Sequence, residues 1–457
     1  MLANVIKNKL KEIMGTDISF SPEDLVCYSF DATNRLFKPD AVAFVRTRED
    51  VSRILKLANE EGFAVVPRGA GSGFSGGSLA VKGGVILSLE KMHRIVEIDS
   101  LDLTAVVEPG VITGHLHDAV EKQGLFYPPD PSSLKFSTIG GNIAECAGGP
   151  RALKYGVTKD YVLGLEVVLP TGEIINTGTR TMKGVVGYDL TRLIVGSEGT
   201  LGVMTRATLS LLPFPEAQKT ILASFKNIRD ASITVSNIIT RGVLPSTLEL
   251  MDEESIKCVE GYRGLGIYGA GAMLLIEVDG KKECVEAEAE ITRDTCFKSG
   301  AFNVTVARDK EESKKLWEAR RAISPSLAKI KPHRLNEDVV VPRSNISELI
   351  EGVKNIGKVR GIAIPCFGHA GDGNIHVNVM IDRNDHEDLE RGKAAVEDIF
   401  NLTLSLNGTI SGEHGVGMTK VPYLDMELKP DVLSLMKRIK DVFDPKGILN
   451  PGKIFKT

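Results

Sequence analysis

The glycine-rich stretch Pro67–Ser78, which reads PRGAGSGFSGGS, limits what this chain can fold into more than any other segment. It follows residues 47–62, whose apolar side chains recur at helical spacing behind a Thr47–Asp50 capping pattern, and the apolar residues 63–66, which are typical of a buried strand. Glycine permits positive φ angles and has no Cβ, so successive backbone N–H groups can converge on an anion such as a pyrophosphate. A tight surface turn is the other structure that this composition allows.

Gly71, Gly73 and Gly76 match the G-x-G-x-x-G pattern of dinucleotide-binding Rossmann folds. That fold requires a helix to begin directly after the pattern, with its N-terminus on the phosphates. Residues 78–92 instead contain a Gly-Gly break and the strand-like sequence VILSL. The sequence therefore favours an anion-binding loop and argues against a Rossmann domain.

Length, charge and cysteine spacing exclude several classes of protein. The 457 residues suggest two or three domains, and the formal net charge of -4 does not point to a nucleic-acid partner. No apolar run is long enough to span a bilayer, and residues 1–15 lack the apolar core and cleavage site of a secretory signal. The six cysteines form no C-x-x-C pair, so we expect no zinc knot, cysteine-ligated iron–sulfur cluster or attached haem, and we expect the reducing cytoplasm as the location.

The order of patterns along the chain predicts an α+β fold. Residues 127–158 are rich in proline, glycine and serine, and we interpret them as an ordered loop system that lets backbones approach closely. Residues 163–175 predict a hairpin with its turn at Pro170–Gly172, and the pair Pro213 and Pro215 marks a domain boundary. From about Gln218, strand and helix patterns alternate, which predicts an antiparallel sheet with helices on one face.

Residues 361–381 read as two strands joined at Asp372–Gly373, a dipeptide typical of two-residue hairpin turns. That turn places His369 directly opposite His376, with Cβ atoms about 5 Å apart. Two imidazoles at this spacing suit one divalent ion, for which a carboxylate would make a fitting third ligand. A polar hairpin tip that binds no ion is the alternative.

Three groups of motifs together point to one family: PRGAGSGFSGGS; FSTIGGNIAECAGG with VGSEGTLGVMT; and CFGHAGDGNIH with SGEHGVG. From about Pro39 to Ile454 the chain resembles the FAD-linked oxidases and dehydrogenases of the vanillyl-alcohol-oxidase (PCMH) type, in the branch of the glycolate oxidase catalytic subunit and D-lactate dehydrogenase. The resemblance implies a PCMH-type FAD domain of two subdomains over residues 1–215, a cap (substrate) domain over 216–420, and a segment 421–457 that returns to the FAD domain.

The resemblance also implies which residues hold FAD, and it makes Pro67–Ser78 the pyrophosphate loop. Because this loop contains no His or Cys, we expect the FAD to be non-covalent. The implied FAD contacts are Pro67, Arg68, Gly69, Ala70, Gly71, Ser72, Gly73, Ser75, Gly76, Pro129, Ser137, Thr138, Gly140, Gly141, Gly148, Glu198, Val203 and Asn450.

For the metal, the resemblance adds Glu413 to His369 and His376 as the third ligand of a zinc, manganese or iron ion. It makes the neighbouring His414 the general base, a role that suits a side chain whose pKa lies near working pH. Adjacent residues on an extended strand point in opposite directions, so His414 need not be a ligand itself.

The resemblance makes Arg320 the residue that grips the substrate carboxylate, as the forked guanidinium geometry favours. Arg321 is adjacent and is the alternative, and Asn378 is expected to add a hydrogen bond to the substrate. Relatives that act on 2-hydroxyglutarate have a further basic residue near the place of Asn336. Its absence favours a monocarboxylate, although Arg334 lies close by in the sequence.

We therefore expect a flavoenzyme that oxidises a small D-2-hydroxy acid, D-lactate or glycolate, to the 2-oxo acid. Metal-assisted proton abstraction by His414 would accompany hydride transfer to flavin N5. Electrons would pass to a separate acceptor, such as an iron–sulfur subunit or an electron-transferring flavoprotein, which could also hold the chain at a membrane; a homodimer is a further possibility. The alternatives are an oxygen-reducing oxidase of the same superfamily and an inactive flavin-binding subunit of a redox complex.

Overall fold

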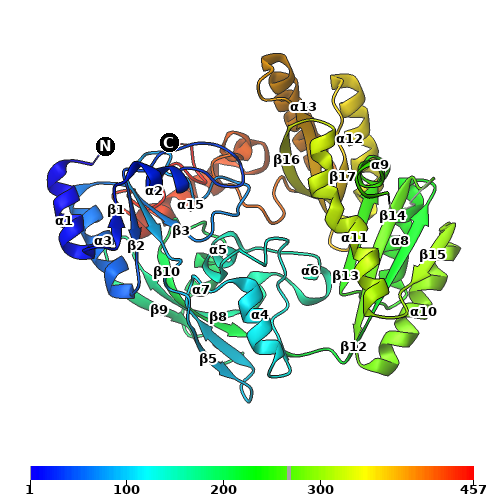
Figure 1. The fold of residues 1–457 in the computed structure, drawn as a ribbon, viewed down its shortest axis with the longest axis horizontal. Coiled ribbons are helices and arrows are strands. Elements are labelled where there is room, and N and C mark those ends of the chain that lie inside the picture. The colour runs from blue at the N-terminus through cyan, green and yellow to red at the C-terminus, as the bar shows by residue number, and fades with distance from the viewer. Residues whose placement is uncertain (1, 265–268, 457) are drawn as a thin grey trace. The chain divides into compact units, whose positions relative to one another are not determined.

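The computed structural model describes residues 2–264 and 269–456 (Figure 1). The described chain divides into two compact units. The first unit comprises Met1–Gly148, Val157–Phe214 and Glu413–Thr457, and the second comprises Gly149–Gly156 and Pro215–Gly412. The main chain therefore enters the second unit twice, first for Gly149–Gly156 and again from Pro215 to Gly412.

The glycine-rich loop leaves the end of β3, a strand of a mostly parallel sheet in the first unit (Figure 1). The strands run in the order β1-β2-β4-β3; β2, β4 and β3 are parallel, and β1 is antiparallel to β2. Between Gly69 and Gly84 the described chain contains no helix, and strand β4 follows, as the sequence predicts. The elements of this region are α1 Asn4–Met14, β1 Ile18–Ser19, α2 Pro22–Cys27, β2 Ala41–Phe44, α3 Arg48–Glu61, β3 Val65–Arg68 and β4 Val85–Ser88.

Helix α3 anchors the start of this region to the sheet. The predicted capping box is present, because Thr47 Oγ1 accepts the Asp50 N–H at 3.1 Å and the Asp50 carboxylate accepts the Thr47 N–H at 3.0 Å. Ile54 and Leu55 are fully buried in one apolar core with Val65 and Val85. Each such side chain contributes about 1.5–3 kcal/mol by leaving water, so the base of the glycine-rich loop is firmly held.

A second, antiparallel sheet completes the first unit, with the strand order β5-β6-β10-β8-β9. The predicted hairpin is present as β8 and β9, and its turn closes with the Gly172 N–H donating to Leu169 O at 2.7 Å. The C-terminal segment returns to the first sheet, where Val65 N–H donates to Ile448 O and Asn450 N–H donates to Val65 O. The remaining elements are β5 Ile95–Asp99, β6 Thr104–Val107, α4 Thr113–Glu121, β7 Leu125–Phe126, η1 Thr158–Asp160, β8 Val162–Val168, β9 Ile174–Gly178, α7 Leu190–Ile194, β10 Val203–Ser210, β11 Leu212–Pro213, η4 Val421–Tyr423, α14 Leu424–Glu427 and α15 Pro430–Phe443.

The segment expected to be an ordered loop, residues 127–158, also contains two short helices, α5 Ile139–Glu145 and α6 Ala152–Tyr155. Helix α5 begins at Thr138, whose Oγ1 accepts the Gly141 N–H at 3.2 Å. Its glycines have low helix propensity, so the sequence pattern does not predict this helix. Gly140 is required by packing, since a Cβ at this position would lie 2.7 Å from Pro109 Cβ.

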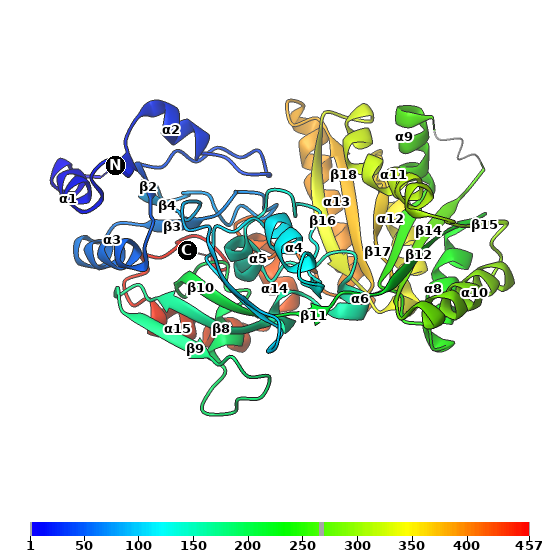
Figure 2. The ribbon, with the colours of Figure 1, turned by 60° about the horizontal axis from the view of Figure 1, so that its bottom comes forward.

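The second unit is built on an antiparallel sheet, which in the described residues has the order β15-β12-β14-β13-β17-β18-β16 (Figure 2). Every strand and helix that the sequence predicts between Gln218 and Arg308 is present. The strands are β12 Ala217–Phe225, β13 Thr247–Asp252, β14 Ala272–Gly280, β15 Asn303–Val306, β16 His333–Val340, β17 Cys366–His369 and β18 Asn374–Ile381. The helices are α8 Ile228–Thr240, α9 Glu253–Arg263, α10 Lys282–Lys298, α11 Lys310–Ser326, η2 Leu327–Lys329, η3 Arg343–Asn345, α12 Ile346–Arg360 and α13 His386–Ser405.

The two faces of this sheet differ in character. On one face, α9 and α11 pack against Met251, Met273 and Phe367 in an apolar cluster. The register places Glu249, His369 and His376 on that same face, because their neighbours alternate to the other side. Helices α8, α10 and α13 also contact the sheet. Gly392 of α13 lies against the side chains of Ile381 and Val379, which are on the face of β18 opposite to His376. Glu249, His369 and His376 thus form a polar area on the same face of the sheet as the apolar cluster.

Candidate functional site

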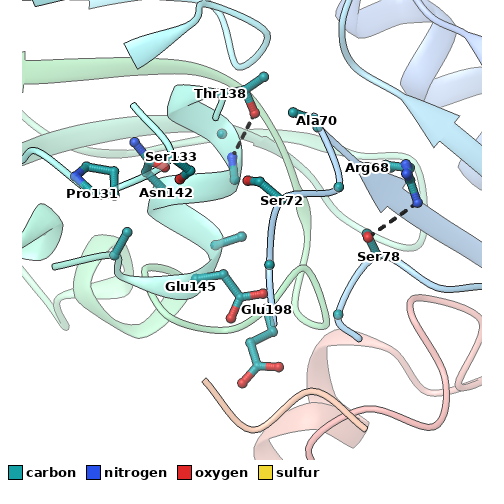
Figure 3. A pocket seen from close by; sticks show the side chains of 18 of the residues that line it. Arg68, Ala70, Ser72, Ser78, Pro131, Ser133, Thr138, Asn142, Glu145 and Glu198 are labelled. Atoms are coloured by element: carbon teal, nitrogen blue, oxygen red, sulfur yellow. Dashed lines mark hydrogen bonds between the residues drawn. The ribbon is translucent and has the colours of Figure 1, made fainter. Parts of the chain in front are cut away.

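A cavity in the first unit lies between the glycine-rich loop and helix α5 (Figure 3). The space in this cavity that no protein atom fills is about 1120 Å³, counting the part that is open to solvent. It is lined by Pro67, Arg68, Gly69, Ala70, Gly71, Ser72, Gly73, Phe74, Gly77, Ser78, Leu89, Pro131, Ser132, Ser133, Thr138, Gly140, Gly141, Asn142, Ala144, Glu145, Ala147, Glu198, Gly199, Glu413 and His414.

The glycine-rich loop presents a row of free backbone donors to this cavity. Within residues 2–264 and 269–456, the N–H groups of Gly69 to Gly73 have no hydrogen-bond acceptor. A Cβ on Gly69 would collide with Thr138 Oγ1, and a Cβ on Gly71, whose φ is +65°, would collide with the Arg68 guanidinium. Converging N–H groups without side chains in front of them fit a pyrophosphate, as in FAD.

Arg68 supports this loop from behind. It is buried, its Nη2 donates to Phe30 O at 2.8 Å, and its guanidinium lies 5.3 Å from the centroid of the Tyr28 ring. Burial lowers the pKa of Arg68, against the pull of the Asp31 carboxylate. The loop therefore carries a fixed positive charge beneath it, which adds to its attraction for phosphate.

The residues that the resemblance implies for FAD divide into two groups. Pro67 to Gly73, Thr138, Gly140, Gly141 and Glu198 line the cavity, whereas Ser75, Gly76, Pro129, Ser137, Gly148, Val203 and Asn450 do not. Asn450 contacts two lining residues, because its Nδ2 donates to Gly77 O and Glu198 O at 2.9 and 2.8 Å. Which of these residues touch FAD stays a prediction.

Helix α5 adds two polar residues that sequence reasoning missed, Asn142 and Glu145 (Figure 3). They are three residues apart and so share a helix face, a signal that becomes visible only once the helix is recognised. Glu145 and Glu198 both lie against Gly415, where an added Cβ would collide with Glu145 Oε2 and would be 2.9 Å from Glu198 Oε1. Burial raises the pKa of the Glu145 carboxyl well above its ordinary value, and Glu198 raises it further. Glu198 accepts the backbone N–H groups of Val416 and Gly417, so Glu145 is the member of the pair that we expect to be protonated.

The motif SGEHGVG brings Glu413 and His414 to the same cavity in the first unit. Ser75 O accepts the N–H groups of Met418 and Thr419 at 2.8 and 3.2 Å, which ties the motif to the glycine-rich loop. The His414 ring lies 5.1 Å, centroid to centroid, from the Phe74 ring. The predicted base therefore lies beside the predicted pyrophosphate loop.

The hairpin that carries the two predicted histidine ligands has a different register from the one expected. Asn374, not His376, pairs with His369, and His376 pairs with Phe367. The turn is longer than two residues, because Gly373, with a φ of +86°, closes a loop in which its N–H donates to His369 O at 3.1 Å. The shift is by two residues, so both histidines keep the same face. Their ring centroids are 5.2 Å apart and their planes are 85° apart.

Glu249, which sequence reasoning did not identify, lies between the predicted metal ligand and the predicted carboxylate grip. It is fully buried on β13; one carboxylate oxygen contacts His369 Nδ1, and the other accepts Arg320 Nε at 2.6 Å. Burial alone would raise the pKa of Glu249, but His369 and Arg320 together hold it at about 2. Nothing in the local sequence TLELMD distinguishes this glutamate from an ordinary strand residue.

The structure distinguishes Arg320 from Arg321. Arg320 belongs to the polar area: its side chain is 14% exposed and its guanidinium lies 4.7 Å from the centroid of the Phe367 ring. Arg321 is exposed and lies against Trp317 at 5.6 Å. The Trp317 indole N–H donates to Glu277 at 2.7 Å, which fixes this part of α11 on the sheet.

A second buried carboxylate, Asp338, lies beside His376. Its Oδ1 is 3.6 Å from His376 Nδ1 and accepts Asn374 Nδ2 at 2.5 Å, while its Oδ2 accepts the Gly412 N–H at 3.0 Å. Asp338 thus holds the last residue of the second unit, the one directly before Glu413. Histidines that face carboxylates through one ring nitrogen are typical metal ligands, so these residues suit a divalent ion.

The other predicted substrate residues lie further along the same strands. Asn378 is fully buried, its Nδ2 donates to Pro365 O and His376 O at 3.4 and 3.3 Å, and its Oδ1 has no partner in the described chain. It pairs with Asn336 across the β16–β18 ladder. The Arg334 guanidinium donates to Ser324 Oγ at 3.0 Å, and burial lowers its pKa.

The six cysteines are free thiols in this structure. In residues 2–264 and 269–456, no helix combines the length and apolar character needed to cross a membrane.

Comparisons with known proteins agree with the cavity. Residues 39–178 match an FAD binding domain, and residues 214–454 match the C-terminal domain of FAD linked oxidases. The chain is 47% identical over 458 residues to the glycolate oxidase subunit GlcD of Bacillus subtilis (strain 168), covering 100% of this chain and 97% of that protein. It is 38% identical over 429 residues to a D-lactate dehydrogenase of Anaerostipes hadrus, covering 91% of this chain and 90% of that protein.

Solved structures agree with the fold. Superposition on p-cresol methylhydroxylase with substrate bound gives a TM-score of 0.80 at 18% identity, and on 4-ethylphenol oxidase from Gulosibacter chungangensis a TM-score of 0.79 at 20% identity; each covers 98% of this chain and 96% of the other. These two matches concern the fold alone. Because two family models and close relatives span almost the whole chain, and because the first unit presents a loop suited to a pyrophosphate, this protein belongs to the FAD-linked oxidases and is an FAD-dependent oxidoreductase.

Proposed function

We propose that this enzyme oxidises a small D-2-hydroxy acid, D-lactate or glycolate, to the corresponding 2-oxo acid. The observation that carries the proposal is the row Arg320–Glu249–His369, which fixes a guanidinium and an imidazole on one face of the second unit's sheet. Such a pair can hold a carboxylate and, through a divalent ion, the neighbouring hydroxyl oxygen. The names of the relatives, a glycolate oxidase subunit and a D-lactate dehydrogenase, support this substrate class.

Each residue of the proposed site has a distinct task. Because Arg320 uses Nε for Glu249, its two terminal amino groups are left to grip the substrate carboxylate. His369, His376 and Glu413 would hold a zinc, manganese or iron ion, which when bound would lower the pKa of the substrate hydroxyl. Asn378 would donate or accept a hydrogen bond at the substrate, and His414 would accept the hydroxyl proton at a ring nitrogen.

The residues that would bind FAD and the substrate would also position the reacting carbon of the hydroxy acid. Non-covalently bound FAD would accept the hydride that leaves the Cα of the hydroxy acid. The chain's own contribution is to hold the Cα–H bond in line and to take up the proton.

We propose a monocarboxylate substrate because the uncharged Asn336 lies near the place where relatives that act on 2-hydroxyglutarate have a basic residue. The nearest candidate, Arg334, has its guanidinium bonded to Ser324 of α11. A second carboxylate on the substrate would therefore lack a dedicated cation at Asn336.

The electron acceptor belongs to the same proposal. We expect a separate redox partner, an iron–sulfur subunit or an electron-transferring flavoprotein, in the cytoplasm or at the membrane surface through that partner; the chain could act as a homodimer. An oxidase that reduces oxygen is the enzymatic alternative, and a flavin-binding subunit without activity is the other. The joint presence of His369, His376, Glu413 and His414 favours an active enzyme.

An anaerobic screen tests the proposal. The FAD-loaded protein, supplied with zinc or manganese, is mixed with D-lactate, L-lactate, glycolate and D-2-hydroxyglutarate, and flavin bleaching is followed. We expect D-lactate or glycolate to bleach the flavin fastest, and the reduced flavin to be reoxidised slowly by air. Fast peroxide formation would identify an oxidase, and a flavin that none of the acids reduces would refute the proposed activity.

A further inference from the structure

Glu249 contacts two groups to which different tasks have been assigned. It lies in the middle of the sheet, opposite Leu275 on one side and His369 on the other, and its side chain has no exposed surface. One oxygen contacts His369 Nδ1 and the other accepts Arg320 Nε at 2.6 Å. Each oxygen of this carboxylate is therefore committed to one of the two groups.

We propose that Glu249 is a positioning residue that orients the carboxylate grip Arg320 and the metal ligand His369 together, so that substrate binding and metal binding depend on one side chain. The inference rests on the proposed function, because it assumes that Arg320 meets the substrate and that His369 meets the ion. Glu249 itself would touch neither.

The consequence for His369 is a fixed tautomer. An anionic carboxylate has only acceptors, so the ring nitrogen that faces it, Nδ1, must carry the proton. Nε2 then keeps its lone pair, and a lone pair is what a metal ion requires. The carboxylate also makes the imidazole a stronger base, and therefore a better ligand.

The consequence for Arg320 is a fixed direction. With Nε bound by Glu249 and the guanidinium plane against the Phe367 ring at 4.7 Å, two of its three nitrogens remain for a ligand. A guanidinium so held loses less rotational entropy on binding than a free one, which strengthens a bidentate carboxylate contact.

Glutamine at position 249 would keep the shape and break both functions. Its amide has one acceptor oxygen and one donor NH₂ group. If the oxygen serves Arg320, the NH₂ faces His369 Nδ1 and moves the ring proton to Nε2, which then cannot bind a metal. If the oxygen serves His369, the NH₂ opposes Arg320 Nε and displaces the guanidinium. In either orientation the partner that keeps the oxygen also exchanges a charged acceptor for a neutral one, so its bond weakens as well and both affinities should fall.

Glu277 provides a matched control on the same sheet. It is nearly as buried, accepts the Trp317 indole N–H at 2.7 Å and the Thr220 hydroxyl at 2.6 Å, and supports the same helix one turn before Arg320. Glu277→Gln should cost stability without touching either His369 or Arg320.

The experiment compares FAD-loaded wild type, Glu249→Gln and Glu277→Gln. Zinc affinity is measured by competition with a coloured chelator, and the affinity for oxamate, a non-reducing carboxylate of lactate size, by its perturbation of the flavin spectrum at saturating zinc. For Glu249→Gln we expect a 10- to 100-fold loss of zinc affinity and at least a tenfold loss of oxamate affinity, with unchanged flavin content. Glu277→Gln should keep both affinities within about twofold, whatever its melting temperature.

The outcomes separate the inference from the proposed function. If wild type binds zinc and is reduced by a hydroxy acid, while Glu249→Gln behaves like Glu277→Gln, only the inference is overturned. A loss of one affinity with the other unchanged also overturns it, because the two tasks are then independent. If wild type binds no zinc and no hydroxy acid reduces it, the proposed function is refuted. Should Glu249→Gln not fold, Glu249→Asp replaces it: withdrawing the charge by one methylene should lower both affinities, and unchanged values would overturn the inference.

Discussion

Glu249 on β13 and His369 on β17 face each other directly across an antiparallel ladder, with the carboxylate against the Nδ1 atom of the imidazole. The two residues are 120 positions apart in the chain, and Arg320, the other partner of Glu249, is 71 positions from it. The pKa of Glu249 is held at about 2 even though burial alone would raise it, so the carboxylate stays charged through the physiological range.

Replacing Arg320 by lysine should weaken substrate binding, because an ammonium cannot form the two-pronged contact or keep the Nε bond to Glu249. A lost charge-assisted hydrogen bond costs about 1.5–3 kcal/mol, so we expect KM to rise roughly ten- to hundredfold. Arg321→Lys is the control and should change KM less than about twofold. Steady-state kinetics with an artificial acceptor measure both; equal effects of the two variants would assign the grip to neither arginine alone.

Removing the imidazole of His376 should empty the metal site and leave FAD in place, since the glycine-rich loop belongs to the other unit. The His376→Ala variant should be folded and yellow and should bind little metal. The hydroxy acid should not reduce its flavin. Metal analysis beside the flavin spectrum measures both properties. Full metal content together with full activity would mean that the hairpin is a structural turn.

His414→Ala should behave differently, with metal and FAD both retained and the rate of flavin reduction lowered. Loss of a general base costs typically 10²–10⁴-fold, so the anaerobic reduction rate should fall by that factor. If this variant loses its metal instead, the assignments of base and ligand are exchanged.

Asp338→Asn should lower zinc affinity, because the amide cannot accept from both Asn374 Nδ2 and the Gly412 N–H while facing His376. The change would loosen the chain directly before Glu413, and we expect about a tenfold loss. Asp388→Asn is the control, since it removes another buried carboxylate of the same unit without touching the histidines. An equal loss of zinc affinity in both variants would point to general destabilisation.

Asp388 should contribute to acid stability. Burial alone would raise its pKa, but Lys331, the Asp382 N–H and Arg391 hold it at about 2, below the usual 3.8. A carboxylate with a lowered pKa stabilises the fold above its unfolded pKa, and this stability is lost as the pH falls from 3.8 towards 2. We expect Asp388→Asn to cost about 1–2 kcal/mol at pH 7, after allowance for its partly exposed partners. In melts from pH 7 to pH 3 the gap to wild type should narrow; a gap independent of pH would contradict the assignment.

The flavin should be released by acid. The glycine-rich loop Pro67–Ser78 contains no histidine or cysteine, so the purified protein should be yellow and its FAD should appear in the supernatant after acid precipitation. Colour that stays with the precipitated chain would show a covalent bond elsewhere.

Local patterns predicted a large part of this fold. The capping box at Thr47, the absence of a helix after the glycine-rich loop, and the β8–β9 hairpin all depend on residues close together in the sequence, where propensity and turn chemistry act directly. Helix α5 was not predicted because Gly140 and Gly141 have low helix propensity, although close contact with Pro109 requires a glycine at position 140.

The amino-acid sequence by itself thus determined the position of the glycine-rich loop, the alternation of strands and helices, the family and the identities of the two hairpin histidines. Only the tertiary structure decided the hairpin register, the contact of Arg320 and not Arg321 with Glu249, and the presence of Glu249 and Asp338 beside the histidines. The reason is physical. A turn one pair of residues longer shifts a whole ladder, and a carboxylate on β13 meets an imidazole on β17 only because long-range strand pairing brings them together, which no spacing within the sequence records.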